Sequence, residues 1–345
     1  MKSRFCQFKH TARAAIAALA IASSPLYAAP LFSDIYVFGD SLSDTGNTRS
    51  EVPFGSTGTV AALAGYGPNG RFSNGPVWHE YLADLLALPR ATRSSAGGNN
   101  YAYGGARVDN AGGVSAGVLT QQARYNTDLG GATSDPDALY VAWAGGNDMR
   151  DLVGSVDPLA AINATLDSLF GVLGGLVASG AGTLLIPNLP DLGSIPEFRT
   201  SAEAASATFV TTAWNTGLEQ RVNGLAATTS ASIYFLDVFS VFNDIIADPA
   251  PFGFTNATGE CRSVVSSGFL GLGRTEVECA GAAGYVFWDE IHPTTAAHSQ
   301  LGASAFALLS SGAAVGTVPA PMTLWLFLFG LLALIYMHRR NAVAA

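Results

Sequence analysis

Short apolar runs alternate with longer segments of helical periodicity along most of this 345-residue chain. Continuous apolar runs that end at Gly or Pro predict buried strands, and apolar residues recurring every three or four positions predict helices. The expected strands are residues 34–38, 138–144, 182–186 and 232–238, with another just before Asn100. The expected helices are residues 78–88, 157–178, 202–225, 241–247 and 294–309. This alternation predicts an α/β fold with a parallel sheet covered on both faces.

Three Gly-rich segments interrupt the alternation, and we expect them to be long loops. They are residues 53–75, 97–117 and 253–284. Long loops in compact domains are often functional, and parallel sheets bind ligands beyond the carboxyl ends of their strands. The residues that follow each strand are therefore the first candidates for a functional site.

The first 28 residues have the composition of a secretory signal peptide. Residues 1–13 carry four basic side chains and no acid, residues 14–22 are small or apolar, and residues 26–28 (LYA) offer a cleavage site. An N-terminal membrane anchor is the alternative, for which the apolar run is short. We expect residues 1–28 to be removed on export and residues 29–315 to form the folded domain.

The tail, residues 316–345, joins a Pro-rich motif (VPAP, 318–321) to the apolar segment Met322–Met337, which Arg339 and Arg340 follow. The apolar segment is slightly short for a bilayer span, and the paired arginines would stay on the cytoplasmic side. The tail resembles the PEP-CTERM sorting signals of Gram-negative bacteria, although Ala320 stands where that family normally has Glu. The resemblance implies transient membrane anchoring and processing by an exosortase-type enzyme. It also implies delivery to the cell surface, the outer membrane or the extracellular matrix.

The part of the chain between these two ends is strongly acidic. All 26 acidic residues lie between Asp34 and Glu290, against eleven basic residues, every one an Arg, so the net charge there is near −15. No basic stripe is present, which argues against nucleic acid as a partner. Hydrophobic residues make up 49% of the chain, which is enough for a large core.

Two cysteines, Cys261 and Cys279, remain once Cys6 leaves with the signal. Their position in one Gly-rich stretch of an exported domain predicts a disulfide, with two unpaired thiols as the alternative. Neither Cys-x-x-Cys nor His-x-x-x-His spacing accompanies them, so we expect no metal site.

Ser41 follows the first expected strand within the block FGDSLSDTGN (38–47). Gly39 allows a tight turn there, so that the Ser41 hydroxyl can be exposed beside free backbone N–H groups. Taken alone, Ser41 fits a helix N-cap as well as a nucleophile. Asp44 and Asn47 are expected to brace this loop through local hydrogen bonds.

Asp289 and His292 lie near the other end of the domain, three residues apart. A serine nucleophile needs a base to take its proton, and that base needs an acceptor to orient it. Candidate bases are few, because the domain has only three histidines, the other two being His79 and His298. A hydrogen-bonded structural histidine is the alternative for His292, and His79 is expected to be structural.

Two further blocks follow expected strands and could stabilise a negative oxygen. Gly105 lies in NYAYGGA (100–106) and can offer an unobstructed backbone N–H, while Asn147 in GGND (145–148) carries a side-chain NH₂. An ordinary Gly/Asn turn is the alternative for each. Asp148 is expected to anchor its loop. Most aromatic residues near strand ends and loops should be core, and some could line an acyl pocket. These are Trp143, Phe254, Phe287 and Trp288.

These blocks, together with DEIHP (289–293), resemble the GDSL, or SGNH, hydrolase family in order and context. The segments GRFSNGPVWHEYLA (70–83) and IPNLPDLGSIP (186–196) look like its secreted lipase and esterase branch. The resemblance implies that Ser41 is the nucleophile, His292 the general base and then acid, and Asp289 its orienter. The oxyanion donors would be Ser41, Gly105 and Asn147. It also implies a three-layer, flavodoxin-like α/β/α sandwich with a parallel sheet of about five strands, and no metal or cofactor.

We therefore expect an exported carboxylesterase or lipase that cleaves acyl esters through an acyl-enzyme on Ser41, with an acyl ester or lipid as substrate. A phospholipase or lipid acyltransferase and a sugar O-acetyl esterase are alternatives, because the motifs leave the acyl acceptor open. A non-catalytic surface or matrix protein is an alternative of another class. The five filled catalytic positions argue against it.

Overall fold

The structure, a computed structural model, describes residues 31–51, 65–67, 69–109, 115–267 and 273–316, and only the backbone within residues 264–276. The expected signal peptide (residues 1–28) lies outside the described residues. So does the motif-bearing tail from residue 317 onward, including the apolar segment Met322–Met337.

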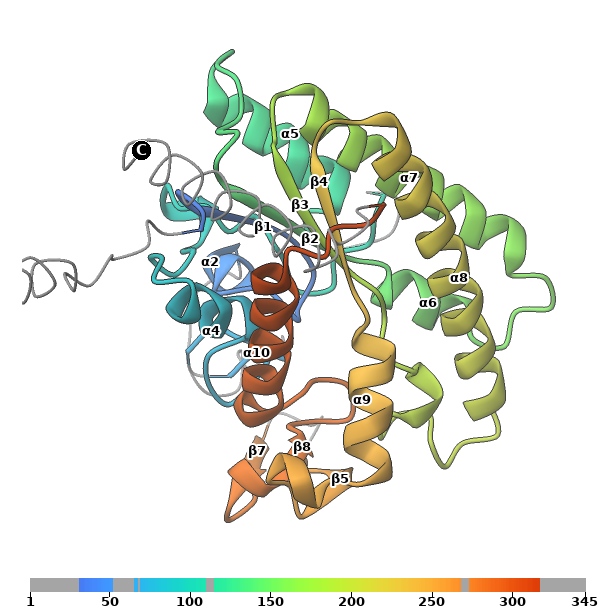
Figure 1. Ribbon diagram of the computed structural model, residues 1–345. Coiled ribbons are helices and arrows are strands. Elements are labelled where there is room, and N and C mark those ends of the chain that lie inside the picture. Colours follow the sequence, from blue (N-terminus) through green and yellow to red (C-terminus); the bar gives the residue numbers. More distant parts are fainter. Residues whose placement is uncertain (1–30, 52–64, 68, 110–114, 268–272, 317–345) are drawn as a thin grey trace, which may run out of the picture. The chain divides into compact units, whose positions relative to one another are not determined.

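Four parallel strands form the central sheet in the order β1-β2-β3-β4 (Figure 1). They are β1 Ile35–Gly39, β2 Leu139–Trp143, β3 Thr183–Pro187 and β4 Ser232–Leu236. β2 is buried along its whole length, which explains its unbroken apolar sequence. All four strands lie where the sequence predicts them, and Pro187 ends β3 as expected.

The expected fifth strand is reduced to hydrogen bonds beside β1. The Tyr101 N–H donates to the Val37 carbonyl at 2.7 Å, and the Tyr103 N–H donates to the Gly39 carbonyl at 3.2 Å. Among the described residues, a single bridge, between Val37 and Asn100, joins this segment to β1 with strand geometry. The side chain of Asn100 accepts the Ala102 N–H at 2.8 Å, which turns the chain away from a regular ladder. The chain therefore runs beside β1 where a fifth strand was predicted, but the regular sheet has four strands.

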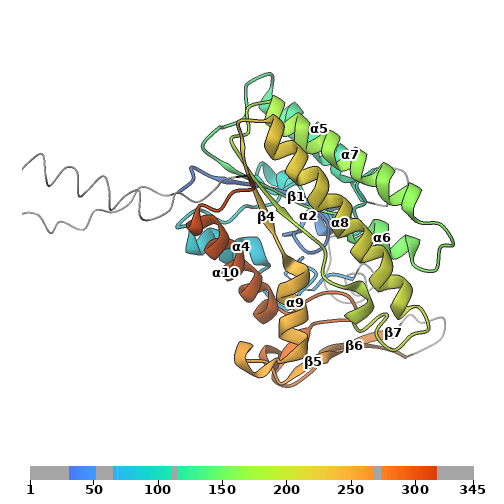
Figure 2. The same cartoon turned by 45° about the vertical axis from the view of Figure 1, so that its right-hand side comes forward.

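Helices cover both faces of the sheet (Figures 1 and 2). α4 and α10 pack together on one face, and α5, α7 and α8 pack side by side on the other. The helices of these two layers are α4 Trp78–Leu85, α5 Val118–Leu129, α7 Leu159–Ala178, α8 Ala204–Thr228 and α10 Thr295–Ser311. The short helices are α2 Asn47–Glu51, α6 Gly146–Leu152 and α9 Val238–Ala247. α5 was not among the expected helices.

α7 is long and apolar enough to cross a membrane by length and composition, and no other described helix is. Its predicted stripe, including Ile162, Leu166, Leu169 and Leu173, is buried in the core. Leu159, at its first residue, is 47% exposed. This pattern is that of a core helix in the layer beside α5 and α8.

The prediction of a loop over residues 253–284 is wrong. β5 Asn256–Glu260 pairs in parallel with β8 Tyr285–Phe287, and β6 Arg262–Ser267 pairs with β7 Gly273–Glu278 as an antiparallel hairpin. The strand signal is weak because Gly, Ser and Glu are frequent there, and strand propensity depends on pairing partners that a local pattern does not show.

Gly39 shows why the end of β1 needs glycine. Its φ is +154°, and a Cβ atom there would lie 2.3 Å from the carbonyl oxygen of Trp143 on β2. A backbone carbonyl cannot move aside as a flexible side chain can. With a side chain at residue 39, β1 and β2 could therefore not keep their pairing beside Ser41. The close approach of β1 to β2 therefore depends on glycine, which has no side chain, at residue 39.

We predict that Gly39→Ala lowers the free energy of unfolding by about 2–4 kcal/mol, from the clash and the strained φ together. Gly171→Ala is the matched control, because Gly171 lies in α7 with nothing within 4 Å of an added Cβ. That control should be stabilised by about 0.5–1 kcal/mol. Urea denaturation of both variants measures the difference, and equal stability would contradict the role given to Gly39.

Candidate active site

Ser41, Asp289 and His292 meet in one chain of hydrogen bonds. Ser41 lies just after β1, and the other two lie on the connection between β8 and α10. The His292 Nε2 atom is 2.8 Å from the Ser41 Oγ, although 251 positions separate the two residues in the sequence. The His292 Nδ1 atom is 2.9 Å from Oδ2 of Asp289. The structure thus brings together the three side chains that the sequence predicts.

Asp289 orders both its own loop and the imidazole ring. Its Oδ1 accepts the backbone N–H groups of Ile291 and His292 at 2.9 and 2.6 Å. Burial acts to raise the pKa of Asp289, but the adjacent His292 and these N–H groups lower it below its ordinary value. The carboxylate therefore stays ionised and holds Nδ1 of the ring toward itself, leaving Nε2 for Ser41.

The other two histidines have different surroundings. His79 Nε2 lies 2.9 Å from the Ser43 carbonyl and so helps to fix the loop after Ser41, as expected of a structural residue. His298 is buried in α10, and burial lowers its pKa to about 3, so its ring is neutral. Within the described ranges, no group of three His, Cys, Asp or Glu side chains could hold a metal ion.

Buried polar side chains hold the loop that carries Ser41. Asp44 accepts the N–H groups of Gly46 and Asn47, each at 2.7 Å, and its other oxygen accepts the Gly104 N–H at 3.0 Å. The Asn47 side chain donates to the Asn100 carbonyl at 2.7 Å. These bonds join the block after β1 to the block at residues 100–106, so Asp44 and Asn47 brace the loop as predicted.

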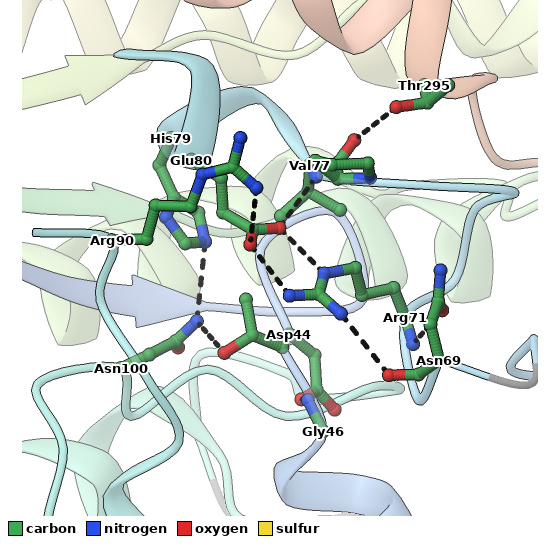
Figure 3. Close-up of polar contacts among 12 residues, drawn as sticks. Asp44, Gly46, Asn69, Arg71, Val77, His79, Glu80, Arg90, Asn100 and Thr295 are labelled. Atoms are coloured by element: carbon green, nitrogen blue, oxygen red, sulfur yellow. Dashed lines mark hydrogen bonds and ion pairs between the residues drawn. The ribbon is translucent and has the colours of Figure 1, made fainter. Parts of the chain in front are cut away.

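A partly buried ion pair holds the chain just before α4 (Figure 3). Arg71 donates to both carboxylate oxygens of Glu80 at 2.6 and 2.7 Å, and Arg90 approaches the same carboxylate at 3.7 Å. Burial acts to raise the pKa of Glu80, but the Arg71 guanidinium lowers it below its ordinary value. Glu80 also accepts the Val77 N–H at 2.9 Å, at the start of α4. The chain before α4 is therefore tied to the helix.

Phe72, next to Arg71, forms a wall of the site that the sequence analysis did not single out. Its ring centroid is 5.2 Å from that of His292. A Cβ atom on Gly104 would lie 2.1 Å from the same phenyl ring. Phe72 therefore fills the space between the imidazole and the glycine loop. The sequence feature that could have identified Phe72 is its position inside the block at residues 70–83.

The expected oxyanion donors come from three segments, and the pocket lining places Asn147 beside Ser41. Asn147 lines the same pocket as Ser41, and its side-chain nitrogen donates to the Ala106 carbonyl at 3.0 Å. Gly105 has a φ of +72°, in the region that favours glycine. Among the described residues, the backbone N–H groups of Ser41 and Gly105 donate to no acceptor. Both N–H groups are thus free to bind a developing negative charge.

Asp148, beside Asn147, anchors its loop as the sequence predicts. Its two carboxylate oxygens each lie 3.2 Å from the Val108 N–H. Burial raises the pKa of Asp148 to about 6. The bond joins the segment after β2 to the loop that holds Gly105, so the segments that carry Asn147 and Gly105 are fixed to each other.

A mostly apolar pocket lies beside Ser41. Its lining residues are Asp40, Ser41, Leu42, Trp143, Gly146, Asn147, Arg150, Leu189, Pro190, Leu192, Ile195, Phe242, Phe287, Ile291 and Pro293. Arg150 is held in a two-bond pair with Glu197 at 2.8 and 2.7 Å. Of the four aromatic residues considered from the sequence, Trp143 and Phe287 line the pocket.

Cys261 and Cys279 form a disulfide at the base of the β6–β7 hairpin. The next residue, Arg262, is buried, with its guanidinium carbon 4.3 Å from the centre of the Trp288 ring and its Nη1 3.8 Å from Oδ2 of Asp289. The disulfide-closed hairpin therefore begins beside the aspartate of the hydrogen-bonded chain.

Comparison with known proteins places this site in a family. The model of the GDSL-like lipase/acylhydrolase family matches residues 35–305, more than three quarters of the chain. The match includes Ser41, Asp289 and His292 and the whole four-stranded sheet. The chain belongs to this family, and two relatives from Arabidopsis thaliana are GDSL esterase/lipases by name.

Several curated relatives align over most of the chain. A phosphatidylcholine-sterol acyltransferase of Aeromonas hydrophila is 26% identical over 327 residues, with 82% of this chain and 91% of that protein covered. A GDSL esterase/lipase of Arabidopsis thaliana is 29% identical, with 79% and 84% covered. A thermolabile hemolysin of Vibrio parahaemolyticus is 28% identical, and this chain spans 60% of its length.

Asp40, directly before Ser41, is a buried carboxyl whose ionisation destabilises the fold. Burial raises its pKa from an ordinary 3.8 to about 6, against a backbone hydrogen bond from Leu42 that lowers it. A carboxyl with a raised folded-state pKa stabilises the fold below about pH 4, and this contribution is lost as the pH rises through 6. The difference corresponds to about 3 kcal/mol at neutral pH.

We predict that Asp40→Asn becomes more stable relative to the unsubstituted protein as the pH rises from 4 to 8. The expected relative gain in the free energy of unfolding is about 3 kcal/mol, because Asn cannot ionise. Its side-chain oxygen can still accept the Leu42 N–H, which is 3.0 Å away. Urea denaturation at a series of pH values measures this gain. A stability difference that does not change with pH would show that burial does not raise the pKa of Asp40.

Proposed function

We propose that this chain is an exported serine ester hydrolase that cleaves acyl esters through an acyl-enzyme on Ser41. The observation that carries the proposal is the 2.8 Å contact between the His292 Nε2 and the Ser41 Oγ, with Asp289 on the far side of the ring. Family membership supports the reaction class. The role given to each residue is part of our proposal.

The first half of the reaction forms the acyl-enzyme. The Oγ of Ser41 attacks the ester carbonyl carbon while its proton passes to Nε2 of His292. The resulting imidazolium is stabilised by the Asp289 carboxylate, which stays ionised. When the tetrahedral intermediate collapses, the carbon–oxygen bond to the alcohol breaks and the alcohol takes the proton from His292.

The oxyanion of that intermediate needs donors that already point toward it. The free backbone N–H groups of Ser41 and Gly105 and the side-chain NH₂ of Asn147 fill this role in our proposal. The hydrogen bonds of Asp44 and Asp148 keep the loops in place, so little reorganisation is needed as the charge develops.

In the second half an acceptor hydroxyl attacks the acyl carbon while its proton passes to Nε2 of His292. The bond between the acyl carbon and the Ser41 Oγ then breaks, and His292 returns the proton to Oγ, which restores the free serine. Water gives hydrolysis, and a second alcohol gives acyl transfer. The name of the Aeromonas relative, which aligns over nearly its whole length, favours acyl transfer as the second candidate activity. Incubating the acyl-enzyme with a competing alcohol and measuring the new ester separates the two.

We predict that Ser41→Ala abolishes both p-nitrophenyl ester hydrolysis and covalent labelling by a fluorophosphonate probe. Asn147→Ala is the contrasting variant, because it keeps the nucleophile and removes one oxyanion donor. Its kcat should fall by about 10²–10³ with labelling still detectable. Labelling of the Ser41→Ala protein would place the nucleophile elsewhere. Inactivity of the unsubstituted protein toward both reagents would favour a non-catalytic binding protein.

We also propose export, from the signal-like residues 1–28 and the tail beyond residue 316. The disulfide between Cys261 and Cys279 supports this, because disulfides persist in oxidising compartments. Intact-mass analysis of the protein recovered from its native cells should give a chain that begins after Ala28 and ends at or before the apolar segment. A mass that includes residues 1–28 would contradict export by this signal.

A further inference from the structure

The apolar walls of the pocket beside Ser41 come from three separate parts of the chain. Leu189, Leu192 and Ile195 come from the segment after β3, Phe242 comes from α9, and Phe287 comes from β8. All five side chains are at most 5% exposed. A cavity with such walls favours an apolar group over a hydrated one.

The polar lining residues are engaged by the protein itself. Arg150 is paired with Glu197, Asn147 donates to the Ala106 carbonyl, and Asp40 accepts the Leu42 N–H. Apart from the second N–H of Asn147, which the proposed function assigns to the oxyanion, these side chains leave few polar partners for a bound sugar or headgroup. The pocket therefore fits the hydrocarbon part of an acyl group.

The size of the pocket sets a limit on that hydrocarbon. Its volume is about 40 Å³. Pockets that bury most of a drug-sized ligand measure roughly 300–1,000 Å³, so this pocket has room only for a small group. The short hydrocarbon of an acetyl to butyryl group is of that kind.

Phe242 is the lining residue whose size can best set this limit on the length of the acyl chain. Its ring centroid lies 6.3 Å from that of Phe287, so the two rings close one part of the pocket together. Phe287 is only two residues from Asp289, and the Trp143 indole N–H is bonded to the Asn188 carbonyl at 3.0 Å. Phe242 belongs to α9, outside the segments that carry Ser41, Asp289 and His292, so shortening it changes none of these residues directly.

We propose that this pocket is the acyl site, that it restricts the enzyme to esters of short acyl chains of about two to four carbons, and that Phe242 determines the limit. The proposal rests on the proposed function, since it takes Ser41 as the acyl-accepting residue. Chains of eight or more carbons bind poorly because their tail cannot be buried without moving the walls.

The test compares kcat/KM for p-nitrophenyl acetate, butyrate, octanoate and laurate on the full chain. The unsubstituted protein should prefer acetate or butyrate over octanoate by at least tenfold. Phe242→Ala should raise the octanoate-to-butyrate ratio at least tenfold. Leu169→Ala is the matched control, because it also empties buried space but lies in α7, away from the pocket. Its chain-length profile should not change.

Two further variants keep the test decisive if Phe242→Ala does not fold. Phe242→Leu removes less volume and should shift the preference in the same direction. Ile195→Phe fills the pocket and should lower butyrate turnover relative to acetate. A chain-length profile that is unchanged in both variants would overturn the assignment of Phe242 and of this pocket.

Labelling by a fluorophosphonate probe separates this proposal from the general one. If Ser41 is labelled and the protein prefers octanoate or laurate, the short-chain proposal fails while the ester hydrolase stands. If Ser41 is not labelled and no ester is cleaved, both fail together. A short-chain preference that depends on Phe242 supports both.

Discussion

The hydrogen bond between His292 and Ser41 is the constraint on which the rest of the structure depends. It joins the first strand to the connection before the last helix, at a separation of 251 residues. Such a contact requires that every intervening strand and helix leave the carboxyl edge of the sheet open at one place. The parallel order β1-β2-β3-β4 satisfies this, because all four strands end at that edge.

Around this contact, several buried polar side chains have hydrogen-bond or ion-pair partners. Asp44, Asn47 and Glu80 each bond to backbone or to arginine, so the loops gain rigidity from groups that would otherwise be costly to bury. Phe72 shows the consequence, since the segment tied down by Arg71 and Glu80 places its ring against His292. Positioning of the imidazole thus depends on residues far from the reaction itself.

The site also carries features that cost stability. Asp40 and Asp148 are buried with raised pKa values, and Gly39 holds a φ that few residues adopt. All three lie within a few residues of Ser41 or Asn147. Strain and buried charge of this kind gather at functional sites, where geometry is kept at the expense of stability.

The sequence by itself determined the four strands of the sheet and most of the helices, because apolar periodicity and turn residues are local signals. The residues of the hydrogen-bonded chain were expected from the resemblance of several ordered motifs to a hydrolase family, since each motif taken alone also fitted a structural role. The strands at residues 256–278, the walls of the pocket and the contact of Phe72 with His292 were decided only by the tertiary structure. Each depends on which distant segments pack together, as Phe242 from α9 meets Phe287 from β8, and no local pattern records that choice.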